Sequence, residues 1–176
     1  METNITSTKA GLKYGVYAGI ILLLYSLAMY VTGIVDLTDP DRAKIYDYLP
    51  MLITAVIMVL AIKYFKENNE GFLNIGEGII TAIVTGLIGT LISIIWVIVY
   101  FYIIDPEGME TLKDNVIQMT VDKGDATEEQ MESMKGFFNV IFSVPAFAII
   151  SLIYTTVIGL VVGLITSLIM KNSRDN

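Results

Sequence analysis

The sequence contains no cysteine and no histidine among its 176 residues. Without cysteine the chain forms no disulfide, iron–sulfur cluster or Cys-ligated zinc site, and it has no thiol nucleophile. Without histidine it lacks the usual neutral-pH general base, the commonest transition-metal ligand and any Ser-His-Asp triad. These absences exclude most catalytic chemistries. We therefore expect no catalytic residue, no cofactor, no metal site and no enzymatic activity.

Several binding motifs are absent as well. The chain has no Walker A sequence, no Rossmann fingerprint, no EF-hand spacing and no basic patch, so we expect no binding of nucleotides or nucleic acid and no tuned calcium loop. The formal net charge of −7 collects in acidic stretches between apolar segments. These stretches predict a solvated acidic face, with loose divalent-cation binding as the alternative. The first stretch carries Asp36, Asp39, Asp41 and Asp47.

Long apolar segments are what the chain does contain. Hydrophobic residues make up 55% of it and the mean hydropathy is +0.68. Four segments reach the length of about 20 residues that crosses a bilayer. We predict an all-α, polytopic membrane protein in which residues 1–176 form a single domain, a four-helix transmembrane bundle. The predicted spans are 14–35, 46–65, 76–104 and 139–170.

Three of these spans leave an alternative open. The first follows basic residues as a signal peptide would, but its apolar part exceeds an h-region of roughly 7–15 residues and no A-x-A site follows, which favours a retained helix. The second has an apolar part, 49–62, that is short enough for a re-entrant segment. Extended to 46–65, it becomes a full span with Pro50 in its first turn, where the missing N–H is harmless. Pro145 marks either a kink in the fourth span or the start of its membrane part.

Residues 105–138 form the one long polar segment and predict a helical hairpin on the extracytoplasmic side. Asp105 is placed to cap a first short helix that ends at Gly124, and Thr127 begins a capping box for a second. Apolar residues recur at spacings of three and four: Met109, Leu112, Val116 and Met119 on the first helix, and Met131, Met134 and Phe138 on the second. The hairpin packs on itself, on the membrane or on a partner, or it continues the adjoining spans outward.

Four spans place both termini and the link after the second span on one side of the membrane. Basic residues close to the membrane mark the cytoplasmic side. The terminal side holds six of the 11 basic residues, most of them next to span ends: Lys9, Lys13, Lys63, Lys66, Lys171 and Arg174. We therefore predict that both termini lie in the cytoplasm.

Small residues recur every four positions in three of the predicted spans. This spacing lets helix backbones approach closely in lipid. The residues are Gly11, Gly15 and Gly19 in the first span, Gly78, Ala82 and Gly86 in the third, and Ser151, Thr155, Gly159, Gly163 and Ser167 in the fourth. We expect them to pack the four helices of one chain together. In the alternative, one stripe, above all that of the first span, forms a homodimer or contacts another membrane protein.

The central parts of the predicted spans contain no residue that is charged at neutral pH, which argues against a proton pathway. Glu77, between two glycines at the start of the third span, lies where the helix dipole favours a carboxylate. A substrate or cation site is the alternative for this residue. Hydroxyls such as Thr85, Ser93 and Thr155 remain candidates for the lining of a solute route.

The chain resembles the bacterial membrane proteins grouped as domain of unknown function 4199. The resemblance is carried by LKYGVYAGI at the start, KYFKENNEGFLNIGEGI before the third span, YFYIIDPE at its end, and EEQMESMKGFF before the last span. It extends over nearly the whole chain. It implies four spans, a helical insertion before the last one and a bacterial inner membrane, and it brings no catalytic residue.

Two classes of function remain. In the first, the protein is a non-enzymatic accessory, scaffold or partner-binding subunit whose hairpin engages a partner, because methionine-rich faces adapt to partners. The candidate partner-binding residues are Met109, Met119, Met131, Met134 and Phe138. Packing of the hairpin on itself explains the same residues. In the second class, the bundle or its oligomer forms a pathway for a small solute or an ion.

Overall fold

The computed structural model describes residues 5–34, 36–39 and 45–172. Most of these residues are helical and none lies in a strand, which confirms the predicted all-α class. The elements are α1 (Ser7–Thr32), α2 (Ile45–Glu67), α3 (Ile75–Val99), the π-helical turn η1 (Tyr100–Ile104), α4 (Gly108–Asp122), α5 (Glu128–Ser133), α6 (Lys135–Ile141) and α7 (Val144–Met170).

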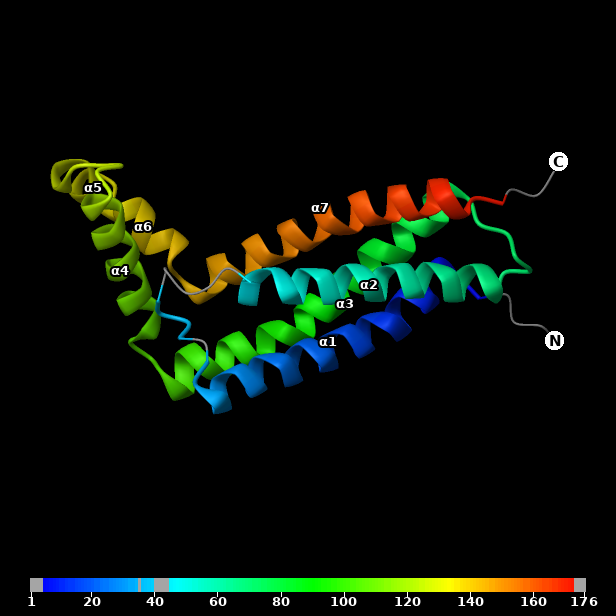
Figure 1. The fold of residues 1–176 in the computed structure, drawn as a ribbon, viewed down its shortest axis with the longest axis horizontal. Coiled ribbons are helices and arrows are strands. Elements are labelled where there is room, and N and C mark those ends of the chain that lie inside the picture. The colour runs from blue at the N-terminus through cyan, green and yellow to red at the C-terminus, as the bar shows by residue number, and fades with distance from the viewer. Residues whose placement is uncertain (1–4, 35, 40–44, 173–176) are drawn as a thin grey trace.

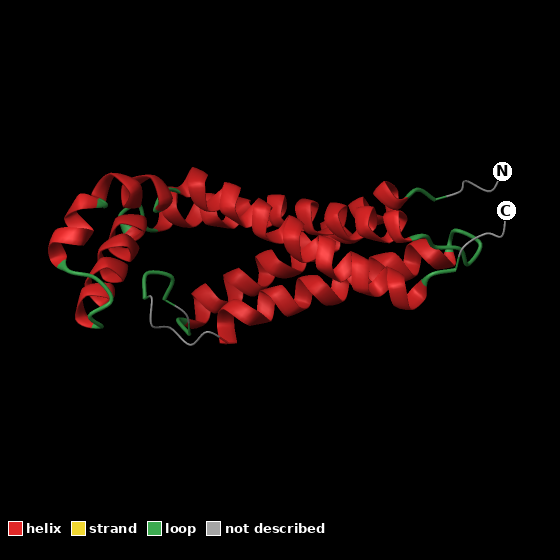
Figure 2. Cartoon of the chain, turned by 90° about the horizontal axis from the view of Figure 1, so that it is seen from above, coloured by secondary structure: helices red, strands yellow, loops and turns green. Residues whose placement is uncertain are grey.

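The four long helices α1, α2, α3 and α7 run lengthwise, and the short helices α4, α5 and α6 lie beyond one of their ends (Figure 1). Both termini lie at the opposite end. The long helices cross near the middle of the bundle and diverge toward the end that bears α4–α6 (Figure 2). We call these two ends the terminal end and the α4–α6 end.

Four helices are long and apolar enough to cross a membrane: Ser7–Thr32, Tyr48–Glu67, Ile75–Ile104 and Val144–Met170. Many large hydrophobic side chains on them point away from the bundle, among them Leu24, Val31, Ile153 and Ile169. An apolar outer surface of this extent is stable in lipid and not in water. The chain is therefore a membrane protein with four candidate spans, as the sequence predicts.

The second span is a complete helix, but Pro50 lies in its second turn, not in its first. A proline there leaves the carbonyl four residues earlier, that of Tyr46, without its helical donor. The hydroxyl of Tyr25 on α1 donates a hydrogen bond to that carbonyl oxygen at 3.0 Å. The Tyr25 hydroxyl thus replaces the N–H donor that Pro50 lacks, and the bond connects α1 with α2.

The last span begins later than the predicted residue 139. Ser143 caps α7, its hydroxyl accepting a hydrogen bond from the backbone N–H of Ala146, and Pro145 lies in the first turn. Pro145 therefore marks the start of the helix and not a kink. Residues 139–141 belong to α6, because the chain turns at Phe142 before α7 begins.

A cluster of buried side chains fills the bundle at the terminal end. Side chains from α1, α2, α3 and the link before α3 form a buried cluster there: Ala10, Met58, Ile62, Phe65, Leu73 and Ala82. The amine of Lys66 donates a hydrogen bond to the Met170 carbonyl at 2.8 Å, and the backbones of Leu73 and Asn172 pair. These contacts fasten the end of α7 to the α2–α3 link.

A second cluster holds the α4–α6 end. Tyr100 and Phe101 of η1 pack against Met109 of α4 and Val144 of α7. The rings of Trp96 and Tyr100 also lie close to Tyr30 of α1, with centroids 5.7 and 5.9 Å away. The aromatic residues that end the third span thereby join it to its neighbours.

Candidate functional site

The glycine stripe of α1 packs against α3 of the same chain. A Cβ added at Gly15 would lie 2.6 Å from the Cβ of Ile88 and 2.9 Å from the carbonyl oxygen of Thr85, so only glycine fits. Gly11 and Gly19 meet α3 in the same way, one turn before and one turn after. Because α3 occupies this face, the stripe is not free for a second copy of the chain.

The stripes of α3 and α7 face each other. A Cβ at Gly163 would lie 2.7 Å from the Cα of Ile79, and one at Gly159 would lie 3.0 Å from the Cα of Ile83. Gly78 packs against Ser167, and Ala82 is fully buried beside Gly163. These contacts place backbone against backbone, which is the geometry that small residues permit in lipid.

The remaining small residues of these stripes carry hydroxyls or lie near them. Gly86 is in contact with Thr155, and the hydroxyls of Thr155 and Thr90 form a hydrogen bond of 2.8 Å between α7 and α3. Ser151 is half-buried and donates to its own helix, to the Phe147 carbonyl. Ser167 is fully buried, and its hydroxyl has no partner within the described chain.

A cavity of about 260 Å³ lies between the four long helices in the half nearer the α4–α6 end. We call it the threonine cavity. Its walls are Leu22, Pro50, Met51, Thr54, Thr90, Ser93, Ile94, Val97, Phe147, Ser151, Tyr154, Thr155 and Ile158. Six of these side chains carry a hydroxyl, and none is charged at neutral pH. The cavity is thus a neutral, partly polar space within the membrane-spanning part.

Most hydroxyl groups in the threonine cavity already donate a hydrogen bond within the protein. Those of Thr54, Ser93 and Ser151 go to carbonyl oxygens one turn earlier in their own helices, at 2.8, 3.0 and 2.8 Å. That of Tyr154 goes to the sulfur of Met51 at 3.0 Å. Back-bonding of this kind satisfies a hydroxyl in an apolar environment.

The pair Thr90–Thr155 is different. Either hydroxyl can donate to the other, and whichever one accepts keeps a proton of its own. That second proton has no acceptor in the part of the chain that the structure describes. The threonine cavity therefore contains one hydroxyl donor for which the described residues provide no acceptor.

The buried cluster at the terminal end fills the space between the helices on that side of the cavity. Met58, Ile62 and Leu73 are fully buried there and fill the space between the helices. Thr85 does not line the cavity, because it is buried against its own helix and donates to the Thr81 carbonyl. Ser93 and Thr155 do line the cavity, as the second class of function requires, but the space ends at the cluster.

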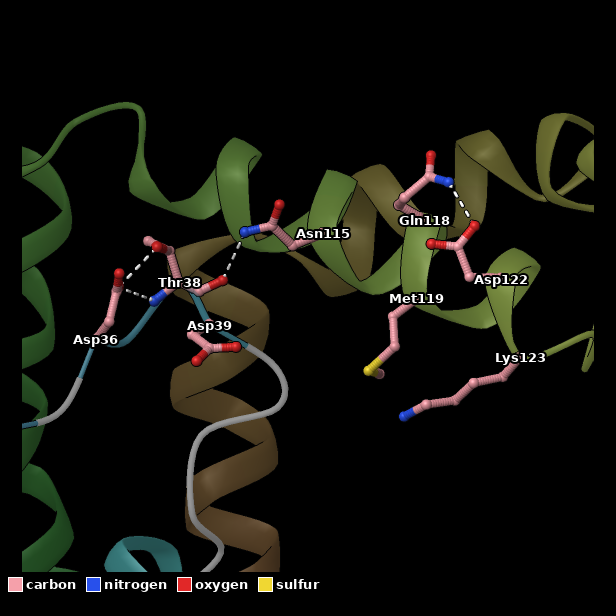
Figure 3. A pocket seen from close by; sticks show the side chains of 8 residues that line it. All are labelled: Asp36, Thr38, Asp39, Asn115, Gln118, Met119, Asp122 and Lys123. Atoms are coloured by element: carbon pink, nitrogen blue, oxygen red, sulfur yellow. Dashed lines mark hydrogen bonds between the residues drawn. The ribbon is translucent and has the colours of Figure 1, made fainter.

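A second hollow lies outside the four candidate spans, between the α1–α2 loop and α4 (Figure 3). The carboxylate of Asp36 accepts hydrogen bonds from the backbone N–H and the hydroxyl of Thr38, and Asn115 on α4 donates to the Thr38 carbonyl at 2.9 Å. Gln118 and Asp122 bond to each other along α4. The bond between Asn115 and Thr38 joins α4 to the loop.

Among the described residues, no group of three or more acidic, histidine or cysteine side chains is placed to hold a metal ion. Asp41 lies outside the described residues, and the side chain of Asp47 is likewise not described. Glu77 serves in a capping box at the start of α3: its carboxylate accepts from the Asn74 backbone at 2.9 Å, and Asn74 accepts in return from the Glu77 backbone.

The predicted partner-binding residues do not form one exposed face. Met109 and Met131 are buried, each 8% exposed, while Met119 and Phe138 are half-buried. Met119 lines the hollow of Figure 3. Of the five, only Met134 is largely exposed. Most of the predicted methionines therefore pack within the α4–α6 region and are not available to a partner.

An exposed apolar face does exist on α6, one residue out of step with the predicted one. Phe137 and Val140 are 57% and 67% exposed, and Met134 precedes them by one turn at 44%. The shift arises because the predicted second helix of the hairpin is two helices, α5 and α6, with a break at Met134. We call Met134, Phe137 and Val140 the α6 face.

The family model for proteins of unknown function DUF4199 matches residues 13–172. The chain belongs to this family. The match covers all four candidate spans except the first six residues of α1, and it includes the α4–α6 region. Neither a curated protein nor a solved structure matches the chain. The family description assigns no activity, so any function must be argued from the geometry.

Sequence reasoning missed both features that the structure adds, the α6 face and the threonine pair. The sequence does contain weak signals for each. Phe137 and Phe138 are adjacent, so one of them has to point away from the packed side of a helix. Thr155 stands in a stripe of otherwise smaller residues, where a hydroxyl in lipid needs a partner.

Proposed function

We propose that this membrane protein is a non-enzymatic accessory subunit that binds a partner protein through the α6 face. The single observation that carries the proposal is the exposure of Phe137 and Val140 on a helix that lies beyond the four candidate spans. Side chains of this size are usually covered in a region outside the membrane, since exposing them to water costs free energy.

The surroundings of the α6 face indicate the chemistry of the partner. Glu129 and Glu132 are exposed on the preceding helix α5, and Lys135 at the start of α6 lies 3.3 Å from the Glu132 carboxylate. The face is therefore an apolar ridge beside a mostly acidic rim. A partner with an apolar groove and basic residues at its edge fits this surface.

The proposal also includes the location of the chain. We propose a bacterial inner membrane, with both termini in the cytoplasm and α4–α6 on the extracytoplasmic side. Support comes from the basic residues close to the span ends on the terminal side, such as Lys13, Lys63 and Lys66, since such residues mark the cytoplasmic side.

The variant Phe137→Ser/Val140→Ser tests partner binding. Both side chains are exposed, so we expect the protein to insert and fold normally, and we expect the captured partner to fall at least tenfold. The measurement is cross-linking in native membranes, affinity purification and quantitative mass spectrometry. Lys135→Ser is the matched control, because it changes an exposed residue of the same helix whose ion pair is worth little. An unchanged partner profile in the serine variant would sink the proposal.

A pathway for a small solute is the second candidate, and the threonine cavity is the observation in its favour. Such a route would have to open the buried cluster at the terminal end. Rapid entry of uncharged solutes into liposomes that hold the purified protein, blocked by enlarging Ser151, would favour this candidate over the first.

A further inference from the structure

One hydroxyl proton of the pair Thr90–Thr155 has no acceptor among the residues that the structure describes. The pair lies within the membrane-spanning part, between α3 and α7, where bulk water is not available as a hydrogen-bond partner as it is at a protein surface. A hydroxyl donor without an acceptor in such surroundings is unfavourable. Both threonines are half-buried and line the threonine cavity, so an acceptor can reach them from that side.

The other residues of the cavity wall determine which kind of molecule can supply the acceptor. Leu22, Ile94, Val97 and Phe147 make it apolar around the hydroxyls, and no charged side chain is present to neutralise an ion. Burial of an unpaired charge here would be far more costly than burial of a neutral group. The occupant is therefore uncharged, with an oxygen that accepts one hydrogen bond and an apolar remainder.

The size of the cavity also limits the occupant. Its volume of about 260 Å³ is just below the range of roughly 300–1,000 Å³ that holds a whole drug-sized molecule. It fits the polar end of a lipophilic molecule whose chain continues between the diverging helices. Water would satisfy the threonine hydroxyl, but it would leave the apolar walls without matching contacts.

We propose that the threonine cavity binds an uncharged lipid through a carbonyl oxygen that accepts a hydrogen bond from Thr90 or Thr155. Two sources share this chemistry: the ester carbonyl of a neutral glyceride and the ring carbonyl of a membrane quinone. The site is independent of the α6 face, so a variant that loses its partner there retains lipid binding.

The composition of the chain supplies the probe. Trp96 is the single tryptophan and lies on α3 between the cavity residues Ser93, Ile94 and Val97. The protein is placed in nanodiscs of ether-linked phosphatidylcholine, which has no ester carbonyl. Trp96 fluorescence is then recorded during titration with a diacylglycerol that has brominated chains or, separately, with a short-chain benzoquinone. Both probes quench tryptophan when they bind nearby.

We expect saturable quenching by at least one probe in the wild-type protein. Thr90→Val/Thr155→Val keeps the shape of both side chains and removes both hydroxyls, so we expect binding to weaken roughly threefold to tenfold. Thr156→Val is the matched control. It removes a hydroxyl of α7 that does not line the cavity and whose proton is bonded to the Leu152 carbonyl of the same helix, and it should leave the affinity unchanged. Ser151→Leu fills the cavity and should abolish saturation even if the valine variant folds poorly.

The outcomes are distinct. Saturation by the glyceride alone or by the quinone alone supports the proposal and identifies the source. Strictly linear quenching by both probes in the wild type indicates partition into the bilayer and a cavity that holds only water, and it overturns the proposal. Equal affinity in the wild type and in a folded double-valine variant overturns it as well. The Phe137→Ser/Val140→Ser protein should bind the probe like the wild type.

Discussion

At the scale of single residues, the bundle depends on polar groups that are satisfied across helices. Tyr25 shows this most clearly, because its hydroxyl completes the hydrogen bonding of a helix to which it does not belong. Pro50 removes one N–H from α2, and the Tyr46 carbonyl accepts the Tyr25 hydroxyl instead. An unpaired carbonyl inside a membrane protein is costly, so this contact matters more than a surface hydrogen bond would.

Replacement of Tyr25 by phenylalanine should lower the free energy of unfolding by about 1–3 kcal/mol, because it leaves the Tyr46 carbonyl unpaired. The measurement is reversible unfolding in mixed micelles with increasing sodium dodecyl sulfate. Tyr48→Phe is the control, since Tyr48 is exposed and no hydrogen bond of its hydroxyl is observed in the described structure. If both variants unfold at the same detergent fraction, the account of Pro50 is wrong.

Residue identities predicted some of these contacts and not others. The small residues were predictable, because spacing by four places them on one helix face whatever the partner helix is. The bond between Thr90 and Thr155 was not, since it joins residues 65 positions apart. It depends on how far each helix is rotated about its axis, which packing decides and sequence spacing does not.

At the scale of elements, the contact between α1 and α3 is very close. Three glycines in successive turns of α1 lie against β-branched residues of α3. These contacts leave no room for a methyl group, and the atoms nearest to Gly15 are a Cβ and a backbone oxygen, neither of which moves easily. The α1–α3 joint is therefore rigid.

The variant Gly15→Ala should destabilise the bundle by about 1–3 kcal/mol, the usual effect of overpacking a tight core. Gly136→Ala is the control. Nothing lies within 4 Å of a Cβ at that position of α6, so alanine there should be neutral or stabilise by up to about 1 kcal/mol through helix propensity. Equal stability of the two variants, measured by the same unfolding assay, would mean that α1 does not pack on α3 as described.

Helix existence was easier to predict than helix ends. The four long helices follow from apolar length alone. The break at Met134 does not, because the spacing of Met131, Met134 and Phe138 is also compatible with one continuous helix. That break rotates α6 so that Phe137 and Val140 face outward and Phe138 packs near the Phe142 ring, with centroids 6.0 Å apart.

At the scale of the whole molecule, the two ends of the bundle differ in a way that fits the proposed functions. The terminal end is filled by a buried cluster and fastened by Lys66 and Asn172. At the α4–α6 end the helices diverge, enclose the threonine cavity and carry the short helices (Figure 1). Both proposed binding surfaces therefore lie in the half that is less tightly packed.

A chain that crosses the membrane with all four candidate spans has α4–α6 and the α2–α3 link on opposite sides of one membrane. Since the chain has no cysteine, a single introduced cysteine is a unique label. Asp125, between α4 and α5, and Glu67, the last residue of α2 before the link, are exposed positions. The decisive measurement is the labelling of Asp125→Cys and Glu67→Cys in spheroplasts with a membrane-impermeant maleimide. We predict that Asp125→Cys reacts in intact spheroplasts and that Glu67→Cys reacts only after permeabilisation. Labelling of both positions from the same side would contradict the four-span arrangement.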